Sequence, residues 1–125
     1  MSREVVKTPN APGAVGPYSQ AIIANGFVFT AGQTGMVPGT KELPAGVEAQ
    51  TRQVLENLKA ILTAAGTGLD RVVKTTVFLQ NMGDFATMNA IYAEYFPNDP
   101  PARSTVEVAK LPIGALVEIE AVALV

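Results

Sequence analysis

The spacing of hydrophobic residues changes several times along this 125-residue chain, and the order of the changes limits the available folds. Residues 47–65 repeat at helical spacing, and Gly66 and Gly68 end this segment. Asp84 begins a second helical segment as its N-cap, and Pro97 ends it. The residues expected on one face of the first helix are Val47, Thr51, Val54, Leu55, Leu58, Ile61, Leu62 and Ala65, and those that recur at three- and four-residue spacing in the second are Phe85, Met88, Tyr92, Tyr95 and Phe96.

Five other segments have the composition of β-strands. They are Tyr18–Ala24, Phe27–Ala31, Val72–Leu79, Arg103–Val108 and Leu116–Val125. The dipeptide Asn25-Gly26 separates the first two and predicts a tight hairpin, because both residues tolerate positive φ. Residues 8–17 and Gly32–Gly46 are rich in proline and glycine, so irregular structure is expected there.

This succession predicts a single α+β domain, residues 1–125, with two crossovers that pack both helices on one face of a mixed sheet. Two positions are open to the last strand. A simple hairpin would place it beside Arg103–Val108, whereas a central position would surround it with strands. The central position is favoured because Ala121–Val125 is apolar on both faces.

Composition excludes several classes of site. The chain has no cysteine and no histidine, so disulfides, thiolate metal sites and most zinc or iron sites are excluded, and no metal is expected. Its net charge is −2 without a basic run, which argues against nucleic acid as a partner. Hydrophobic residues make up 48% and charged residues only 16%, which favours an oligomer. The absence of a long apolar segment predicts a cytoplasmic protein with no membrane partner.

Two charged residues near the C-terminus are candidates for chemistry. Period-2 alternation places Glu118 and Glu120 on the strand face that also carries Val122 and Leu124. That face is either solvated, or covered by another subunit that would desolvate the carboxylates. Arg103 follows the stiff segment Pro-Pro-Ala and is suited either to gripping a ligand carboxylate or to a structural salt bridge.

Weaker candidates lie elsewhere in the chain. Tyr18 follows a stiff loop, where packing and a role in a cleft are both possible. Gly32 and Gly35 either form an anion-binding nest of backbone N–H groups or serve an ordinary turn. Asn89 on the second helix either faces solvent or binds a ligand. The glycine spacing matches neither a P-loop nor a dinucleotide-binding motif.

Several segments together resemble the Rid family, the reactive intermediate deaminases also called the YjgF family. The segments are GPYSQA, FTAGQ, QTRQVLENLKAILTAAG, VVKTTVFL, DFATMNAIYAEYF, and PARSTVEVAKLP followed by VEIEA. The resemblance covers nearly the whole chain. It implies a fold like the Bacillus-type chorismate mutase and a homotrimer with ligand clefts between subunits. It also implies hydrolysis of 2-iminopropanoate and 2-iminobutanoate to 2-keto acids and ammonia, without a metal or organic cofactor.

The resemblance also implies roles for particular residues. Arg103 matches the position that binds the substrate carboxylate, Glu118 the position that activates water, and Tyr18 the tyrosine of the cleft. The positions expected to line the cleft are Ala31, Gly32, Asn89 and Thr105. Ala31 stands where many relatives have serine, and Thr105 where several have cysteine. An alternative function is a trimeric protein that binds keto acids or amino acids without turnover.

Overall fold

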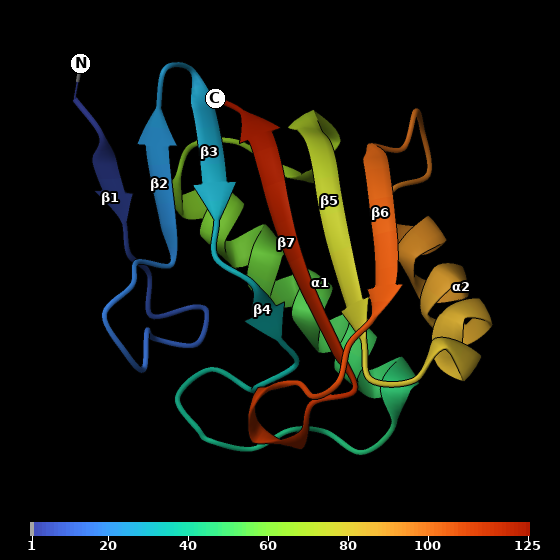
Figure 1. Cartoon of the computed structure of the whole chain (residues 1–125). Helices are drawn as coiled ribbons and strands as arrows, with labels where there is room; N and C mark the ends of the chain where they lie inside the picture. Colours follow the sequence, from blue (N-terminus) through green and yellow to red (C-terminus); the bar gives the residue numbers. More distant parts are fainter. Residues whose placement is uncertain (1) are drawn as a thin grey trace.

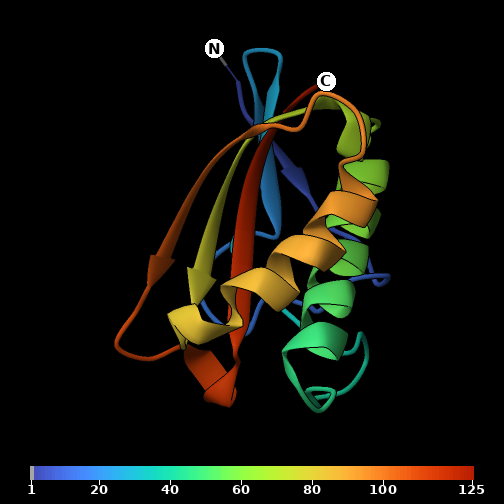
Figure 2. The ribbon, with the colours of Figure 1, turned by 90° about the vertical axis from the view of Figure 1, so that its right-hand side faces the viewer.

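The computed structural model describes residues 2–125, which form one seven-stranded mixed sheet with two α-helices on one of its faces (Figures 1 and 2). The predicted α+β class and the packing of both helices on one face are confirmed. The elements are β1 (Glu4–Val6), β2 (Ala21–Ala24), β3 (Phe27–Thr30), β4 (Gln33–Thr34), α1 (Val47–Ala64), β5 (Val72–Leu79), α2 (Phe85–Tyr95), β6 (Ala102–Glu107) and β7 (Val117–Leu124). Within residues 2–125, no helix is long and apolar enough to cross a membrane.

The last strand is central, as its apolar character predicts. The strand order is β1-β2-β3-β7-β5-β6, and the short strand β4 also pairs with β7. Strand β7 runs antiparallel to β3 and β5, whereas β5 and β6 are parallel across the α2 crossover. Alternate residues of β7, beginning with Val117, are buried beneath the helices. The other set, beginning with Glu118, therefore lies on the face that the helices leave open.

Two buried amides on α1 hold the loop between β4 and α1 in place. The side chain of Gln50 donates to Pro44 O at 3.0 Å and accepts from the Leu116 N–H at 2.9 Å. The side chain of Asn57 donates to Thr34 O at 3.1 Å and to Met36 O at 2.9 Å. Periodicity did not predict either buried residue, because both are polar. Their hydrogen bonds fix this loop against the beginning of β7.

The structure corrects several details of the prediction. Strands β1 and β4 were not predicted, and β2 begins at Ala21 rather than at Tyr18. The hairpin between β2 and β3 is confirmed, with φ values of 52° at Asn25 and 84° at Gly26. Asp84 occupies the N-cap position of α2, but its side chain forms no capping hydrogen bond. Short strands in segments rich in proline and glycine form through pairing with distant partners, which local patterns do not reveal.

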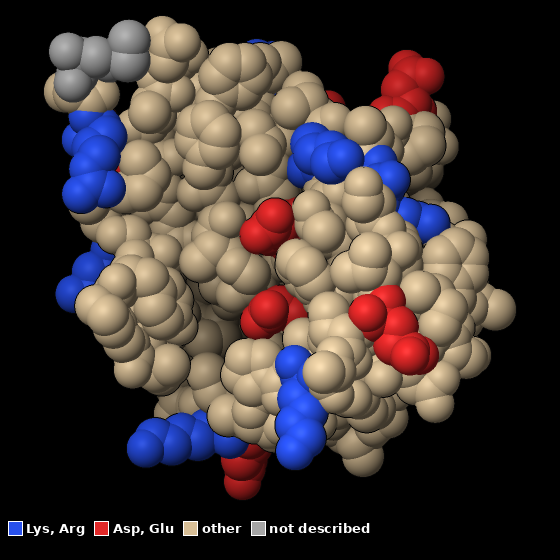
Figure 3. Space-filling view, viewed as in Figure 1, with Lys and Arg blue, Asp and Glu red and all other residues tan. Residues whose placement is uncertain are grey.

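The open face of the sheet combines apolar and acidic side chains. Phe29, Val106 and Leu124 leave 46%, 42% and 37% of their surface exposed there. In the same view as Figure 1, Figure 3 shows a largely uncharged surface with acidic groups near its middle. Glu118 and Glu120 belong to this face. Exposed apolar area of this kind is typical of a surface that another protein chain covers.

Candidate active site

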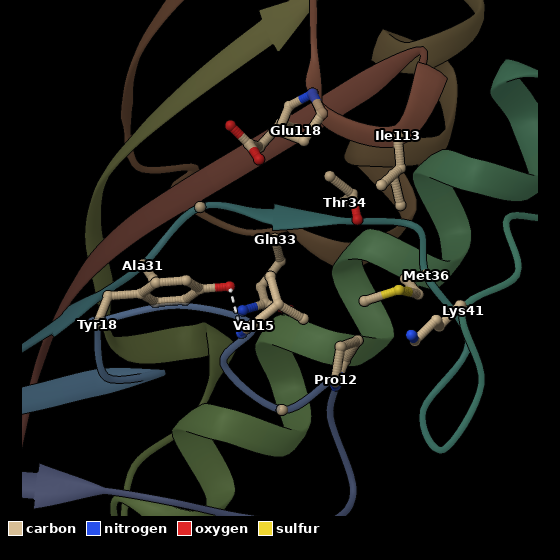
Figure 4. A pocket seen from close by; sticks show the side chains of 13 residues that line it. Pro12, Val15, Tyr18, Ala31, Gln33, Thr34, Met36, Lys41, Ile113 and Glu118 are labelled. Carbon is tan, nitrogen blue, oxygen red and sulfur yellow. Dashed lines mark hydrogen bonds between the residues drawn. The ribbon is translucent and has the colours of Figure 1, made fainter.

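A cavity of about 610 Å³ opens beside the beginning of β7 (Figure 4). It brings together four of the residues singled out in the sequence: Tyr18, Ala31, Gly32 and Glu118. The other lining residues are Pro12, Gly13, Val15, Gln33, Thr34, Met36, Lys41, Pro112 and Ile113. No sequence pattern marks this second group, because most of its members lie in loops that only the fold brings together.

Glu118 is the carboxylate of this cavity. Its side chain is half-buried, and Figure 4 shows the carboxylate at the edge of the cavity, on the same side as Tyr18. Among residues 2–125, ion pairs within 4.0 Å involve only Arg52, so Glu118 has no cationic partner among them. Burial raises the pKa of Glu118, and the negative charge of Glu120 raises it further. A carboxylate in this state accepts a proton more readily than one on the surface, which suits acid–base chemistry.

Tyr18 closes one side of the cavity without being part of the core. Half of its surface, 50%, is exposed, and its hydroxyl accepts a hydrogen bond from the Val15 N–H at 3.3 Å. The buried side chain of Gln20 anchors the loop that precedes it. Gln20 accepts from the Thr8 N–H at 2.7 Å and donates to Pro12 O at 2.8 Å. This wall of the cavity is therefore fixed by hydrogen bonds rather than by hydrophobic packing.

Gly32 lies against the Glu118 carboxylate. A Cβ atom at position 32 would lie 3.0 Å from Glu118 Cδ and 3.1 Å from Glu118 Oε1, so only glycine leaves the carboxylate its present position. The neighbouring Ala31 N–H donates to Gln20 O at 2.8 Å. Because the Ala31 N–H is already used, the Gly32 N–H is the backbone donor of this turn that an anion can contact. Gly35 has a different role: a Cβ atom there would lie 2.7 Å from Gln50 O, so glycine permits close approach to α1.

We expect Gly32→Ala to slow any reaction that depends on the Glu118 carboxylate, while the protein remains folded. The added methyl group displaces the Glu118 side chain, which is flexible, rather than rigid backbone. A misplaced catalytic group typically lowers turnover by about 100-fold, so we expect a fall in kcat of about that size. Steady-state kinetics and thermal unfolding test this. Gly13→Ala is the matched control, because position 13 also borders the cavity and has open space around its Cβ. Equal kcat values for Gly32→Ala and the wild type would contradict this role.

Arg103 and Asn89 lie at a second cavity, of about 380 Å³, between β6 and α2. The Arg103 guanidinium carbon lies 4.7 Å from the centre of the Tyr92 ring and 5.5 Å from that of Phe85. Within residues 2–125, Arg103 has no carboxylate within 4.0 Å. The described residues therefore give Arg103 no structural salt bridge, and its hydrogen-bonding edges remain available to a ligand.

Arg103 and Glu118 lie on opposite faces of the sheet. Arg103 is aligned with the buried Thr75 of β5, so it points to the helix-covered side, and Thr105 follows two residues later on that side. Glu118 is aligned with Phe78 of β5, on the open side. One protomer thus brings Tyr18, Ala31, Gly32 and Glu118 together, but it separates them from Arg103, Asn89 and Thr105. A single small ligand cannot contact both groups in the same chain, since the sheet lies between them.

Metal binding finds no support in the part of the chain that the structure describes. Residues 2–125 contain no group of three or more histidine, cysteine, aspartate or glutamate residues that could hold an ion. The functional groups at the first cavity include the Glu118 carboxylate, the Tyr18 and Thr34 hydroxyls, the Gln33 amide, the Lys41 amine and backbone N–H groups. These groups can move protons and orient an anion or a water molecule.

Comparison with known proteins shows similarity over nearly the whole chain. The family model described as Endoribonuclease L-PSP matches residues 8–125. The 2-iminobutanoate/2-iminopropanoate deaminase of Escherichia coli is 48% identical over 123 residues, which cover 96% of each chain. The crystal structure of YyfA from Yersinia pestis, described as a Rid family protein of unknown function, has a TM-score of 0.94 and 51% identity and covers 99% of this chain and 100% of that one.

A solved structure with a ligand is also similar. Escherichia coli TdcF, crystallised with bound serine, has a TM-score of 0.94 and 44% identity, with 98% of each chain covered. These matches span the segments that contain both cavities. The chain therefore belongs to the endoribonuclease L-PSP family, also called the Rid or YjgF family.

Proposed function

We propose that this protein hydrolyses reactive 2-imino acids and their enamine tautomers, such as 2-iminopropanoate and 2-iminobutanoate, to 2-keto acids and ammonia. The observation that carries the proposal is the half-buried carboxylate of Glu118, which has no cationic partner within residues 2–125 and lies beside Tyr18 and Gly32 in a cavity. The relative that is 48% identical and named as a deaminase for these substrates supports this choice of reaction.

The complete site needs two copies of the chain. We infer that a neighbouring protomer places its Arg103, with Asn89 and Thr105, at the cavity that contains Glu118. The opposite orientation of the two groups and the exposed apolar residues of the open face support this assembly. Each protomer then contributes Arg103 to the cleft on one side and Glu118 to the cleft on the other side, as in a head-to-tail interface that closes into a ring. The resemblance to Rid proteins makes a homotrimer the expected ring.

In this cleft Arg103 binds the substrate carboxylate. Its planar guanidinium offers two parallel N–H donors, which match the two oxygens of a carboxylate. The Gly32 N–H is a further donor to the anion, while Asn89, Thr105 and Ala31 border the substrate. This contact fixes the imine carbon at a constant place, so that a water molecule held by Glu118 is correctly oriented for attack.

Glu118 acts as the general base, and later as the general acid. Protonated imine nitrogen makes the C=N carbon electrophilic, and Glu118 takes a proton from the attacking water, which forms a tetrahedral amino alcohol. Glu118 returns this proton to the nitrogen and then takes the hydroxyl proton as the C–N bond breaks and the carbonyl forms. The departing ammonia accepts that proton, so the products are the 2-keto acid and ammonium. The pKa of Glu118, raised by burial and by Glu120, favours these proton transfers. Tyr18 covers the cavity and orients the water or the substrate through its hydroxyl.

The proposed base predicts the acidic limb of the pH–rate profile. Glu118 must be deprotonated, so kcat/KM falls as pH decreases through its raised pKa, above the range of an ordinary glutamate. Glu120→Gln removes one of the two causes and leaves the burial of Glu118 unchanged. We therefore expect the limb of Glu120→Gln to shift to lower pH but to stay above the ordinary value. A limb that stays in place or moves to higher pH would exclude Glu118 as the titrating base.

The direct test is ammonia release from imines generated in the assay. A pyridoxal-phosphate-dependent dehydratase supplies 2-iminobutanoate or 2-iminopropanoate, and the purified protein is compared with its Arg103→Ala variant. Acceleration by the wild type alone is the expected result. If neither protein accelerates ammonia release and the wild type still binds 2-oxobutanoate, the chain is a ligand-binding protein. RNA incubated in parallel should stay intact, because the chain is acidic and the acidic Glu118 lies in the cavity.

A further inference from the structure

The Arg103 side chain lies against two aromatic rings of α2. Its guanidinium carbon is 4.7 Å from the Tyr92 ring centre and 5.5 Å from the Phe85 ring centre. Phe85, Asn89 and Tyr92 occupy positions i, i+4 and i+7 of α2, so they share one face of this helix. The helical spacing of Phe85 and Tyr92 does not by itself predict that both rings contact an arginine.

Tyr92 is held in one place by its surroundings. Its hydroxyl and Thr75 Oγ1 form a buried hydrogen bond of 2.7 Å, and its ring lies 4.6 Å from that of Phe96. Burial raises the pKa of Tyr92, so the phenol stays neutral and keeps this hydrogen bond. Thr75 is also the residue of β5 aligned with Arg103. The same backbone register therefore fixes both the arginine and the ring on which it rests.

We propose that Phe85 and Tyr92 are positioning residues that hold the Arg103 guanidinium on their ring faces and thereby set the affinity of the site for the substrate carboxylate. The inference rests on the proposed role of Arg103 as the carboxylate-binding residue. It goes further by assigning a cause to the geometry of Arg103, which forms no ion pair within residues 2–125 that would hold it.

The physical argument concerns the freedom of the arginine side chain. A free arginine loses considerable rotamer entropy when it binds a ligand. Contact with the negative face of an aromatic ring attracts the guanidinium without using its N–H groups, which lie at its edge. The rings thus limit the conformations of Arg103 before the ligand arrives, and the donors stay free for the two carboxylate oxygens. Preorganisation of this kind increases affinity without adding a contact to the ligand.

Substitution with fluorinated phenylalanines at position 85 separates this attraction from packing. Mono-, di- and trifluorination weaken the negative ring face stepwise, while ring shape changes little. Phe85 suits the experiment because 37% of its surface is exposed. The dissociation constant of 2-oxobutanoate, a proposed product, is measured by titration of the Arg103 Nε–Hε resonance. That resonance is identified by its loss in Arg103→Ala.

We expect the dissociation constant to rise with each fluorine and to reach about two- to fivefold at trifluorination, the range of an exposed cation–π contact. The melting temperature should stay unchanged, since fluorination changes ring shape and packing little. Phe27 is the control position, because it pairs with Leu124, at the opposite end of β7 from Glu118. The same substitutions at Phe27 should leave the dissociation constant unchanged. Phe85→Leu should increase the dissociation constant at least as much as trifluorination and move the Arg103 resonance out of its ring-shifted position.

Two kinds of failure remain distinguishable. The positioning role is overturned if the dissociation constant stays constant across the fluorinated series. It is also overturned if 2-oxobutanoate binds without moving the Arg103 resonance. Both outcomes hold whether or not the protein is active. Absence of ammonia release by the wild type, together with a stepwise rise in the dissociation constant, overturns the proposed turnover and supports the positioning role.

Discussion

Replacement of Arg103 by alanine should lower kcat/KM for 2-iminobutanoate by roughly 10²–10⁴-fold, which brings the rate close to the uncatalysed background. In the proposed cleft the substitution removes two charge-assisted hydrogen bonds to the substrate carboxylate, each with a typical contribution of about 1.5–3 kcal/mol. It also removes the contact that orients the imine carbon toward the water. The side chain forms no ion pair within residues 2–125, so its loss breaks no salt bridge of the described fold. Ammonia release and thermal unfolding are the two measurements.

Two further variants separate the loss of charge from the loss of donor geometry and control for the removal of an arginine. Arg103→Lys keeps the charge but loses the planar pair of donors, so its activity should fall between those of alanine and arginine. Arg52→Ala is a control for the removal of an arginine, because Arg52 lies on α1 and pairs with Glu94 at 2.9 Å, away from both cavities. It should retain wild-type kinetics. Near wild-type activity of Arg103→Ala would show that the substrate carboxylate binds elsewhere.

The substitution Glu118→Gln should lower kcat by about 10²–10⁴-fold, the usual contribution of a general base. The amide has nearly the same shape as the carboxylate but cannot take the proton from water. Binding of 2-oxobutanoate should remain, because the substitution leaves Arg103, the proposed carboxylate-binding residue, in place. Single-turnover kinetics and ligand titration separate these two effects.

Glu120→Gln is the matched control for Glu118→Gln, because both residues lie on the same face of β7. Above the acidic limb of both proteins, its kcat should equal that of the wild type. Comparable kcat values for Glu118→Gln and the wild type would remove Glu118 from the mechanism.

The raised pKa of Glu118 also has a consequence for stability. A carboxyl group with a folded-state pKa above its unfolded value binds protons more tightly in the folded protein. Its contribution to the free energy of unfolding therefore decreases as pH rises from the unfolded pKa through the folded one. Above that range, Glu118→Gln should be as stable as the wild type or more stable. This result would separate loss of activity from loss of folding.

The sequence contained enough information to predict the main elements of the fold. Both helices, the hairpin at Asn25-Gly26 and the central place of β7 follow from periodicity, turn chemistry and an apolar C-terminus. Strands β1 and β4 could not be predicted, because strands of three and two residues form only through pairing with distant segments. The buried amides Gln50 and Asn57 were missed for a related reason: their partners are backbone atoms of loops.

The division of the site between two faces of the sheet could not be predicted from the chain alone. Period-2 alternation shows which residues of one strand share a face. It does not show whether a given residue of β6 lies on the same face as a given residue of β7, because that depends on the register of each strand with β5. A shift of register by one residue would place Arg103 on the same face of the sheet as Glu118. Only the observed pairing of Thr75 with Arg103 and of Phe78 with Glu118 separates them. This separation is the reason for proposing a site built by two protomers.

Mixing of two inactive variants tests this central claim most directly. Arg103→Ala subunits retain Glu118, and Glu118→Gln subunits retain Arg103, so a cleft formed between one of each can be complete. Random assortment of equal amounts should restore about one quarter of the clefts and about one quarter of wild-type ammonia release. The two variants carry different affinity tags, are expressed together, and are compared with each variant expressed alone. Activity no greater than that of either parent, in assemblies shown to contain both tags, would contradict a cleft shared between protomers.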